Sequence, residues 1–192
     1  MSVGNSNLQK FNSILDLFIK SKTIPSLHSI LNEPITYEIK KVQEIEIQNL
    51  DSVKSSFQDV EDVTAVYVKS AGDFHIGVLL YFTEETSKKL TTKLLGNLQS
   101  DELNKITMSS ISEIGNILSA SVFNALSMSK SCRLDTSVPG YAVETLRTLL
   151  ESVAAETGYD SDSMVISLVE FHGKNSGMLL NMLLIQSPNE LI

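Results

Sequence analysis

Two polar residues, Glu113 and Asn116, are the first candidates for chemistry in this chain. They lie in a segment of mostly small and apolar residues, whose spacing predicts a long helix from about Leu103 to Ser129. At about 100° per residue, Ser109, Glu113 and Asn116 lie within about 60° of one another and share a helix face. The pair is either a catalytic or recognition pair on a rigid helix, or an incidental part of a solvated face. Spacing alone favours the second interpretation.

Gly115 lies between the two polar residues. A glycine inside a helix costs roughly 0.5–1 kcal/mol relative to alanine. This cost predicts that the helix backbone packs against a neighbour too closely to leave room for a β-carbon. The opposite side of the helix is expected to face the core and carries Ile114, Leu118, Ser121 and Ala125.

The rest of the sequence contains few other candidates for catalysis. It has no phosphate-binding loop, no dinucleotide-binding glycine pattern and no G-x-S-x-G motif. No two of the three histidines, His28, His75 and His172, are spaced as metal ligands. Cys132 is expected to be a buried structural thiol, because no nearby histidine or cation cluster would lower its pKa. Asp160 and Asp162 are typical of a solvated turn.

Composition limits the class of protein. The 192 residues are 42% hydrophobic and 20% charged, enough to bury the core of one large domain or of a fused pair of small ones. A net charge of −8 argues against binding to a nucleic-acid backbone, which needs a basic surface. The single cysteine indicates a reducing cytoplasm. No apolar leader and no run of about 20 apolar residues is visible, so neither secretion nor membrane insertion is expected.

Hydrophobic periodicity predicts the order of elements along the chain. A first helix begins near Leu8, Pro25 breaks or kinks it, and Ser21 or Thr23 caps a continuation to Leu31. The other expected elements are an extended segment at 35–47, a loop at 48–62 with a helical turn near 53–57, a hairpin of 63–69 and 74–82, a helix at 84–95 capped by Thr83 and stopped by Gly96, a linker at 96–103, the long helix, an extended segment at 131–138, a helix at 141–155, and a hairpin of 164–171 and 178–185.

This order of elements occurs twice, as a long helix, an extended entry, a connector and a hairpin. We therefore expect a single α+β domain over 1–192, made of two half-repeats at about 8–97 and about 101–192. The halves would be related by a pseudo-two-fold axis and would form one sheet flanked by the two long helices.

The spacing of four residues resembles a known signature. Ser109, Glu113, Asn116 and Pro139 follow the pattern [Asp/Ser]-x3-Glu-x2-Asn-x22-Pro of the CheC/CheX/FliY family of chemotaxis phosphatases, and the pentapeptide EIGNI strengthens the match. The duplicated order of elements is similar to that of CheC over nearly the whole chain.

The resemblance implies a phosphatase that hydrolyses the aspartyl phosphate of a CheY-type response regulator. Asn116 would position the attacking water, and Glu113 would dock on a lysine of the regulator. Ser109 and Pro139 would support the motif by shaping the helix approach and the strand entry. Magnesium would belong to the phosphorylated regulator, so the protein would need no cofactor of its own.

The same resemblance predicts that only the second half keeps a site. CheC-type proteins usually carry the signature twice, but the first-half counterparts here are Ile14, Leu17 and Lys40. The deamidase CheD is a second candidate partner, although the terminal helix that CheC-like proteins can have is missing. The alternative function is a non-catalytic module, either an adaptor for phosphorylated CheY or an assembly module like those of flagellar switches.

Overall fold

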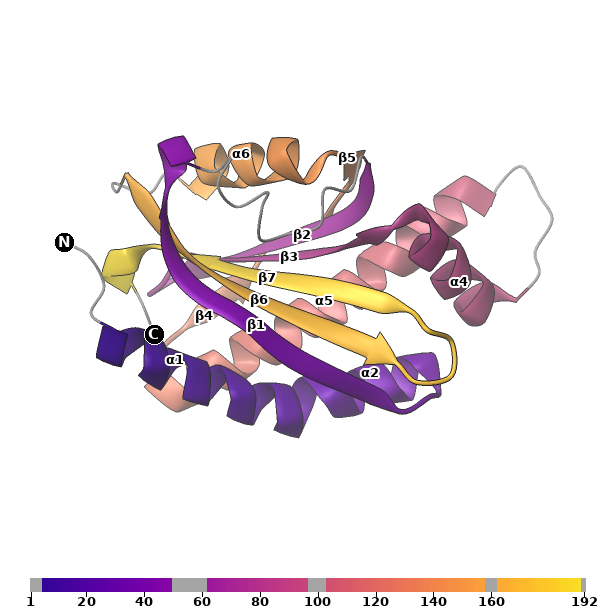
Figure 1. Cartoon of the computed structure of the whole chain (residues 1–192), viewed down its shortest axis with the longest axis horizontal. Coiled ribbons are helices and arrows are strands. Elements are labelled where there is room, and N and C mark those ends of the chain that lie inside the picture. The colour runs from indigo at the N-terminus through magenta and orange to yellow at the C-terminus, as the bar shows by residue number, and fades with distance from the viewer. Residues whose placement is uncertain (1–4, 50–61, 97–102, 158–161, 191–192) are drawn as a thin grey trace.

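The computed structural model describes residues 5–49, 62–96, 103–157 and 162–190 as one antiparallel seven-stranded sheet with helices on both faces (Figure 1). The strands are β1 (Ile35–Glu46), β2 (Val63–Gly72), β3 (Ile76–Thr83), β4 (Leu134–Thr136), β5 (Gly140–Glu144), β6 (Ser163–Gly173) and β7 (Leu179–Gln186). The α-helices are α1 (Asn5–Phe18), α2 (Ile24–Leu31), α4 (Glu84–Leu95), α5 (Leu103–Lys130) and α6 (Leu146–Thr157). The predicted α+β class is confirmed.

The strand order interleaves the two ends of the chain. It runs β1-β6-β7-β3-β2-β4, and β5 also pairs with β2. The first strand of the N-terminal part therefore joins the C-terminal hairpin, while β4 and β5 join the N-terminal hairpin. Two equivalent helix-and-hairpin units would give this order, with β3 and β7 at the centre. The half-repeats at about 8–97 and 101–192 stay a prediction, which this order supports.

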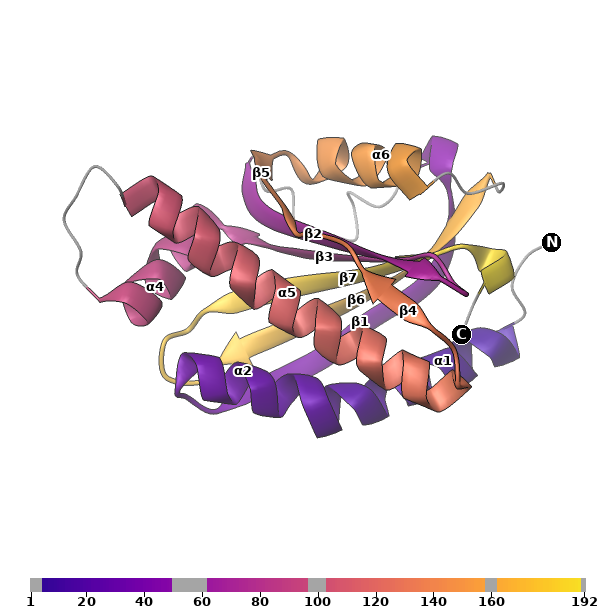
Figure 2. The ribbon, with the colours of Figure 1, turned by 180° about the vertical axis from the view of Figure 1, so that it is seen from behind.

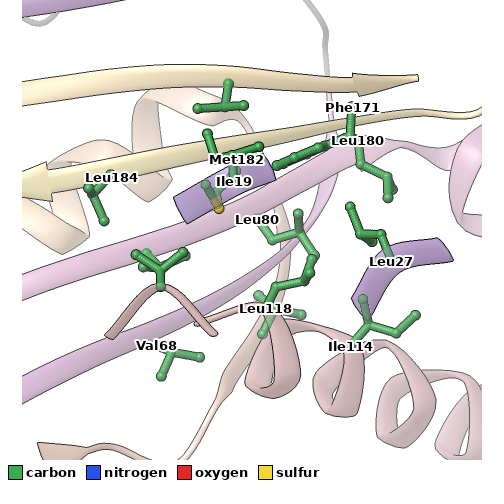
Figure 3. Close-up of a cluster of buried hydrophobic side chains, with 14 of the residues drawn as sticks. Ile19, Leu27, Val68, Leu80, Ile114, Leu118, Phe171, Leu180, Met182 and Leu184 are labelled. Carbon is green, nitrogen blue, oxygen red and sulfur yellow. The ribbon is translucent and has the colours of Figure 1, made fainter. Parts of the chain in front are cut away.

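The helices form unequal layers on the two faces of the sheet. Helices α1, α2 and α5 lie on one face, and α6 lies on the other (Figure 2). On the first face, Ile114 and Leu118 of α5 extend toward Leu80 of the sheet and Leu27 of α2 (Figure 3). Both long helical segments thus share one side of the sheet, and the main core lies beneath them.

A β-bulge in β1 explains its irregular sequence pattern. The register with β6 shifts between Ile39 and Lys41. An extra residue in one strand reverses which face the following side chains occupy. The side chains of Ile35, Tyr37, Ile39 and Val42 therefore pack toward the helix layer, and those of Ile45 and Ile47 pack toward α6.

The N-terminal helix does not break at Pro25, and the predicted cap is wrong. A π-helical turn, η1 (Ile19–Thr23), joins α1 to α2, and the backbone N–H of Ile24 donates to the carbonyl of Ile19. This wider turn keeps the chain helical next to a proline that cannot donate a hydrogen bond. Thr23 has helical dihedral angles and caps nothing. Its hydroxyl lies 3.3 Å from that of Ser121 on α5.

The predicted helix over 141–155 begins too early. Residues Gly140–Glu144 are instead strand β5, because they pair with Val63–Tyr67 of β2 at the end of the sheet. Helix α6 begins only at Leu146, after Thr145, whose hydroxyl accepts the N–H of Thr148 at 3.2 Å. The sequence contained this capping signal at Thr145.

The local predictions at α4, α5 and the two hairpins are confirmed. Thr83 caps α4 by accepting the N–H of Thr86 at 3.3 Å, and Gly96 ends it with φ of 72°.

The loop after β1 opens with a short 3-10 turn, η2 (Ile47–Asn49), and a second 3-10 turn, η3 (Pro188–Glu190), follows β7. The helical turn predicted near 53–57 and most of the turn at 158–162 lie outside the described residues.

A buried carboxylate ties the helix layer to the C-terminal hairpin. Glu33, just after α2, is 1% exposed and accepts the backbone N–H groups of Asn175 and Ser176, each at 2.9 Å. It also accepts the Ser176 hydroxyl at 2.7 Å and pairs with Lys93 of α4 at 3.1 Å. Burial alone would raise the pKa of this carboxyl, but the hydrogen bonds from Ser176 and Asn175 and the contact with Lys93 lower it to about 2.

Glu33→Gln is expected to destabilise the protein at neutral pH. The pKa is lowered from 4.5 in the unfolded chain to about 2, so the ionised carboxylate stabilises the fold by about 3 kcal/mol above pH 4.5. That stabilisation is lost as the pH falls from 4.5 toward 2, because the unfolded state then binds the proton first. Urea unfolding of both proteins between pH 7 and pH 3 measures the difference.

The exposed Glu38, which pairs with Lys40 at 2.7 Å, provides the control. Glu38→Gln is expected to change the free energy of unfolding by less than about 1 kcal/mol. A difference between wild type and Glu33→Gln that does not shrink below pH 4.5 would contradict the role given to the Glu33 charge.

Candidate functional site

Helix α5 lies directly on strand β2, and Gly115 makes this contact possible. A β-carbon at position 115 would lie 2.8 Å from the Cβ of Val66 and closer still to its Cγ1. Real β-carbons do not approach other atoms so closely, so only glycine fits here without movement. The predicted close approach of the helix backbone is confirmed, and its neighbour is the side chain of Val66.

Glu113 lies on the side of α5 that faces away from the sheet, and Asn116 lies on its flank, about 100° around the helix from Gly115. Glu113 and Ser109 are exposed, and Asn116 is half-buried. The predicted core side is confirmed for Ile114, Leu118 and Ala125, which are all at most 2% exposed. Ser121 is half-buried and donates to the carbonyl of Leu118 at 2.7 Å.

Pro139 enters the sheet beside this part of α5. It directly precedes β5, whose first residue Gly140 pairs with Tyr67, the neighbour of Val66 in β2. Helix α5 contacts both β4 and β5, and Figure 2 shows the link between these strands running along the middle of the helix. The fold therefore gathers the signature residues, which are up to thirty positions apart in the sequence, in one region.

The pair is available for contact with another molecule. Within the part of the chain that the structure describes, neither Glu113 nor Asn116 has a side-chain hydrogen bond or ion pair. A primary amide can donate and accept at the same time, and an ionised carboxylate accepts only. This combination can orient a water molecule and bind a cationic group on a partner.

The first-half counterparts provide no such chemistry. Leu17, the predicted first-half counterpart of Asn116, is an apolar residue that is 62% exposed. The residue before it, Asp16, accepts the Tyr37 hydroxyl at 2.6 Å and pairs with Lys20 at 2.7 Å. The ammonium of Lys20, followed by the Tyr37 hydroxyl, lowers the pKa of this carboxyl. The surface therefore holds an internally paired cluster rather than an available carboxylate and amide.

The remaining candidates have local structural contacts. The Nδ1 atom of His28 lies 2.8 Å from the carbonyl of Glu33, and His172 is 3.4 Å from Glu170. Cys132 is half-buried, which corrects the expectation of a buried thiol. Among the described residues, no group of three His, Cys, Asp or Glu side chains could hold a metal ion. None of the helices in those ranges is long and apolar enough to cross a bilayer.

A scan against protein-family models finds no match to the chain. Solved structures with the same fold include FliY from Thermotoga maritima, with a TM-score of 0.74 and 16% identity over 100% of this chain and 94% of that one. The CheX–CheY–BeF3–Mg complex from Borrelia burgdorferi matches with a TM-score of 0.56 and 17% identity, over 91% and 98% of the two chains. The FliM–SpeE complex from H. pylori matches with a TM-score of 0.69 and 10% identity, over 98% of this chain and 91% of that one.

These similarities confirm the CheC-like fold that the sequence predicted. At these identities the likeness concerns the fold, which is shared by a FliY, a CheX and a FliM. The seven-stranded antiparallel sheet with its flanking helices is the common feature.

Gly115→Ala is expected to destabilise the protein, although alanine is the better helix former. The new methyl group would overlap Val66, and overpacking of this kind typically costs about 1–3 kcal/mol. Combining it with Val66→Ala removes the overlap, so the double variant should be more stable than the sum of the two single changes predicts. Urea unfolding of the four proteins in this cycle measures the coupling. Additive effects would contradict the contact.

Proposed function

We propose that this protein is a phosphatase that stimulates hydrolysis of the aspartyl phosphate of a CheY-type response regulator. The observation that carries the proposal is the pair Glu113 and Asn116, available on one exposed face of α5 and spaced from Ser109 and Pro139 as in the family signature. The CheC-like fold supports it. One structure with this fold is a complex of CheX with CheY, BeF3 and Mg.

Asn116 is the water-positioning residue in this proposal. Phosphoryl transfer depends on an in-line nucleophile and on charge compensation more than on a strong base. An amide that enters the regulator's active site can hold the attacking water by donating to it and accepting from it. The half-buried position of Asn116, on a helix fixed by Gly115, limits the orientations the amide can take.

Glu113 is the docking residue. It lies one helical turn from Asn116 and is exposed, so it can pair with a lysine beside the phosphorylated aspartate. A general-base role is unfavourable, because the carboxylate would have to approach an anionic phosphoryl group. Magnesium is assigned to the regulator, so the protein supplies no cofactor. The cytoplasm is the proposed compartment, and CheD is a further partner proposed from the resemblance alone.

A second candidate function is a non-catalytic module that binds phosphorylated CheY or assembles with other switch components. The similarity to FliM favours it, because a TM-score of 0.69 over 98% of this chain is close to that of FliY. The two functions differ in one measurable property: the phosphatase accelerates loss of the acyl phosphate, whereas the adaptor binds without accelerating it.

Asn116→Ala is expected to abolish the stimulated decay of phosphorylated CheY from the same organism, while the free energy of unfolding changes by about 0.5 kcal/mol or less. The truncated side chain can no longer orient the water, but the helix remains on the sheet. Loss of acyl phosphate over time, with wild type and variant side by side, measures the effect. Retained stimulation would refute the role of Asn116, and a wild type that binds without stimulation would favour the adaptor.

Glu113→Gln is expected to raise the half-saturating concentration of phosphorylated CheY more than it lowers the maximal rate, because the change removes a docking charge and leaves the amide in place. Leu17→Ala is the matched control, since Leu17 is the exposed first-half counterpart of Asn116. It should leave both kinetic quantities unchanged. A loss of catalysis in the control would restore the first half as a site.

A further inference from the structure

Strand β1 lies at the outer edge of the sheet, and helix α1 runs along it (Figure 1). Among the described residues, the only strand that pairs with β1 is β6. The backbone N–H and C=O groups on the other side of an edge strand can pair with a further extended chain. We propose that β1 and α1 together bind an extended, acidic peptide segment of a partner protein, which adds to the sheet as one more strand.

A groove separates the edge of β1 from α1. Its larger part has a volume of about 650 Å³ and lies between the later turns of the helical segment and residues 37–39 of β1. Its smaller part has a volume of about 170 Å³ and lies between the earlier turns and residues 39–42. Asn12 and Ile39 line both parts, so the two parts adjoin. No residue of α5 lines the groove, so this inference does not depend on the proposed phosphatase activity.

The length of the groove fits an extended peptide. Along β1 it runs from Tyr37 to Val42, roughly 20 Å at about 3.3 Å per residue. Along the helix it runs from Leu8 to Lys20, roughly 18 Å at about 1.5 Å per residue. Leu8 lies at the Val42 end and Lys20 at the Tyr37 end, so helix and strand are antiparallel. The two walls match in length, and a strand of about six residues fills that length.

The strand wall of the groove carries a row of apolar side chains. Ile35, Tyr37 and Ile39 are half-buried and point toward the helix layer, while the residues between them are exposed. A strand added beside β1 would continue this alternation, with apolar side chains on the helix side. The Tyr37 hydroxyl is already held by Asp16 at 2.6 Å. A wall ordered in this way loses little conformational entropy when a peptide covers it.

The charges along the groove favour an acidic peptide. Three lysines, Lys20, Lys40 and Lys41, and two carboxylates, Asp16 and Glu38, line it. The lining is therefore positive by one charge, although the whole chain has a net charge of −8. Lys40 and Lys41 lie at the β-bulge, and no carboxylate lines the smaller part of the groove there. Bulges and lysines hinder the pairing of two such edges with each other, but lysines attract a partner that carries carboxylates.

Selection from a displayed library of random peptides of about ten residues, with the full chain as bait, tests the proposal. Selected peptides are expected to contain alternating apolar side chains and to be acidic. Their binding should protect backbone amides of β1 from hydrogen exchange. Methylation of alternate peptide nitrogens should abolish the binding, because it removes the donors that pair with the strand edge.

Two variants of the groove should each weaken binding of a selected peptide by about 10-fold or more. Asn12→Trp fills the groove, and Lys41→Glu reverses a charge at the bulge. Leu17→Trp and Lys88→Glu are the matched controls, because both residues are exposed and neither lines the groove. The controls should bind as wild type does, and unfolding in urea checks that all four variants remain folded.

Three results would overturn the proposal: a selection that yields no binding peptide, binding that the N-methylated peptide retains, or an equal loss of binding in the control variants. Self-association that Asn12→Trp abolishes, in a chain that binds no peptide, would assign the edge of β1 to a second copy of the chain and would also overturn it.

Discussion

The contact between Gly115 and Val66 is the constraint on which the candidate site depends. Because position 115 has no β-carbon, the backbone of α5 rests on β2 at a distance that other residues would prevent. The helix then cannot turn about its axis without moving Val66 or exposing Ile114 and Leu118, which are buried. The cost of a glycine in a helix, roughly 0.5–1 kcal/mol, is offset by this packing. The orientation of the rest of the helix surface is fixed as a result. Glu113 lies on the exposed side away from the contact, and Asn116 lies half-buried beside it.

The other side of α5 is held by the N-terminal helical segment. The π-helical turn Ile19–Thr23 contacts α5, and Thr23 lies within hydrogen-bonding distance of Ser121. This turn lets the chain stay helical past Pro25, so that α2 continues across the core. Glu33, after α2, then accepts hydrogen bonds from Asn175 and Ser176 and so connects this segment to the C-terminal hairpin. Helix α5 is thus supported by the sheet beneath it and by a helix that is itself tied to the sheet.

Sequence alone predicted the elements whose signals are local. Helix α4 has its cap at Thr83 and its stop at Gly96, and the hairpins have turn residues between apolar runs. The bulge at β1 and strand β5 were missed or misplaced, because each depends on pairing with a strand distant in sequence. The π-helical turn was missed because Pro25 was expected to end or kink the helix. The residues of β5 have helical spacing, and pairing with β2 overrides it. The shared face of Glu113 and Asn116 was predictable from helix geometry, whereas the position of the segment before β5 depends on hydrogen bonds between Ser137 and Lys69 of β2.

The strand order gives the first half a role in packing whether or not it carries a site. Strand β1 pairs along its length with β6, and its apolar residues contribute to both cores. Ile14 and Leu17, on α1, take no part in this strand pairing, so the pairing does not depend on a carboxylate or an amide at these positions. If the chain contains two half-repeats, as we propose, selection on the first half acts on packing. Selection on the second half acts also on the surface of α5, where Gly115 already fixes the geometry.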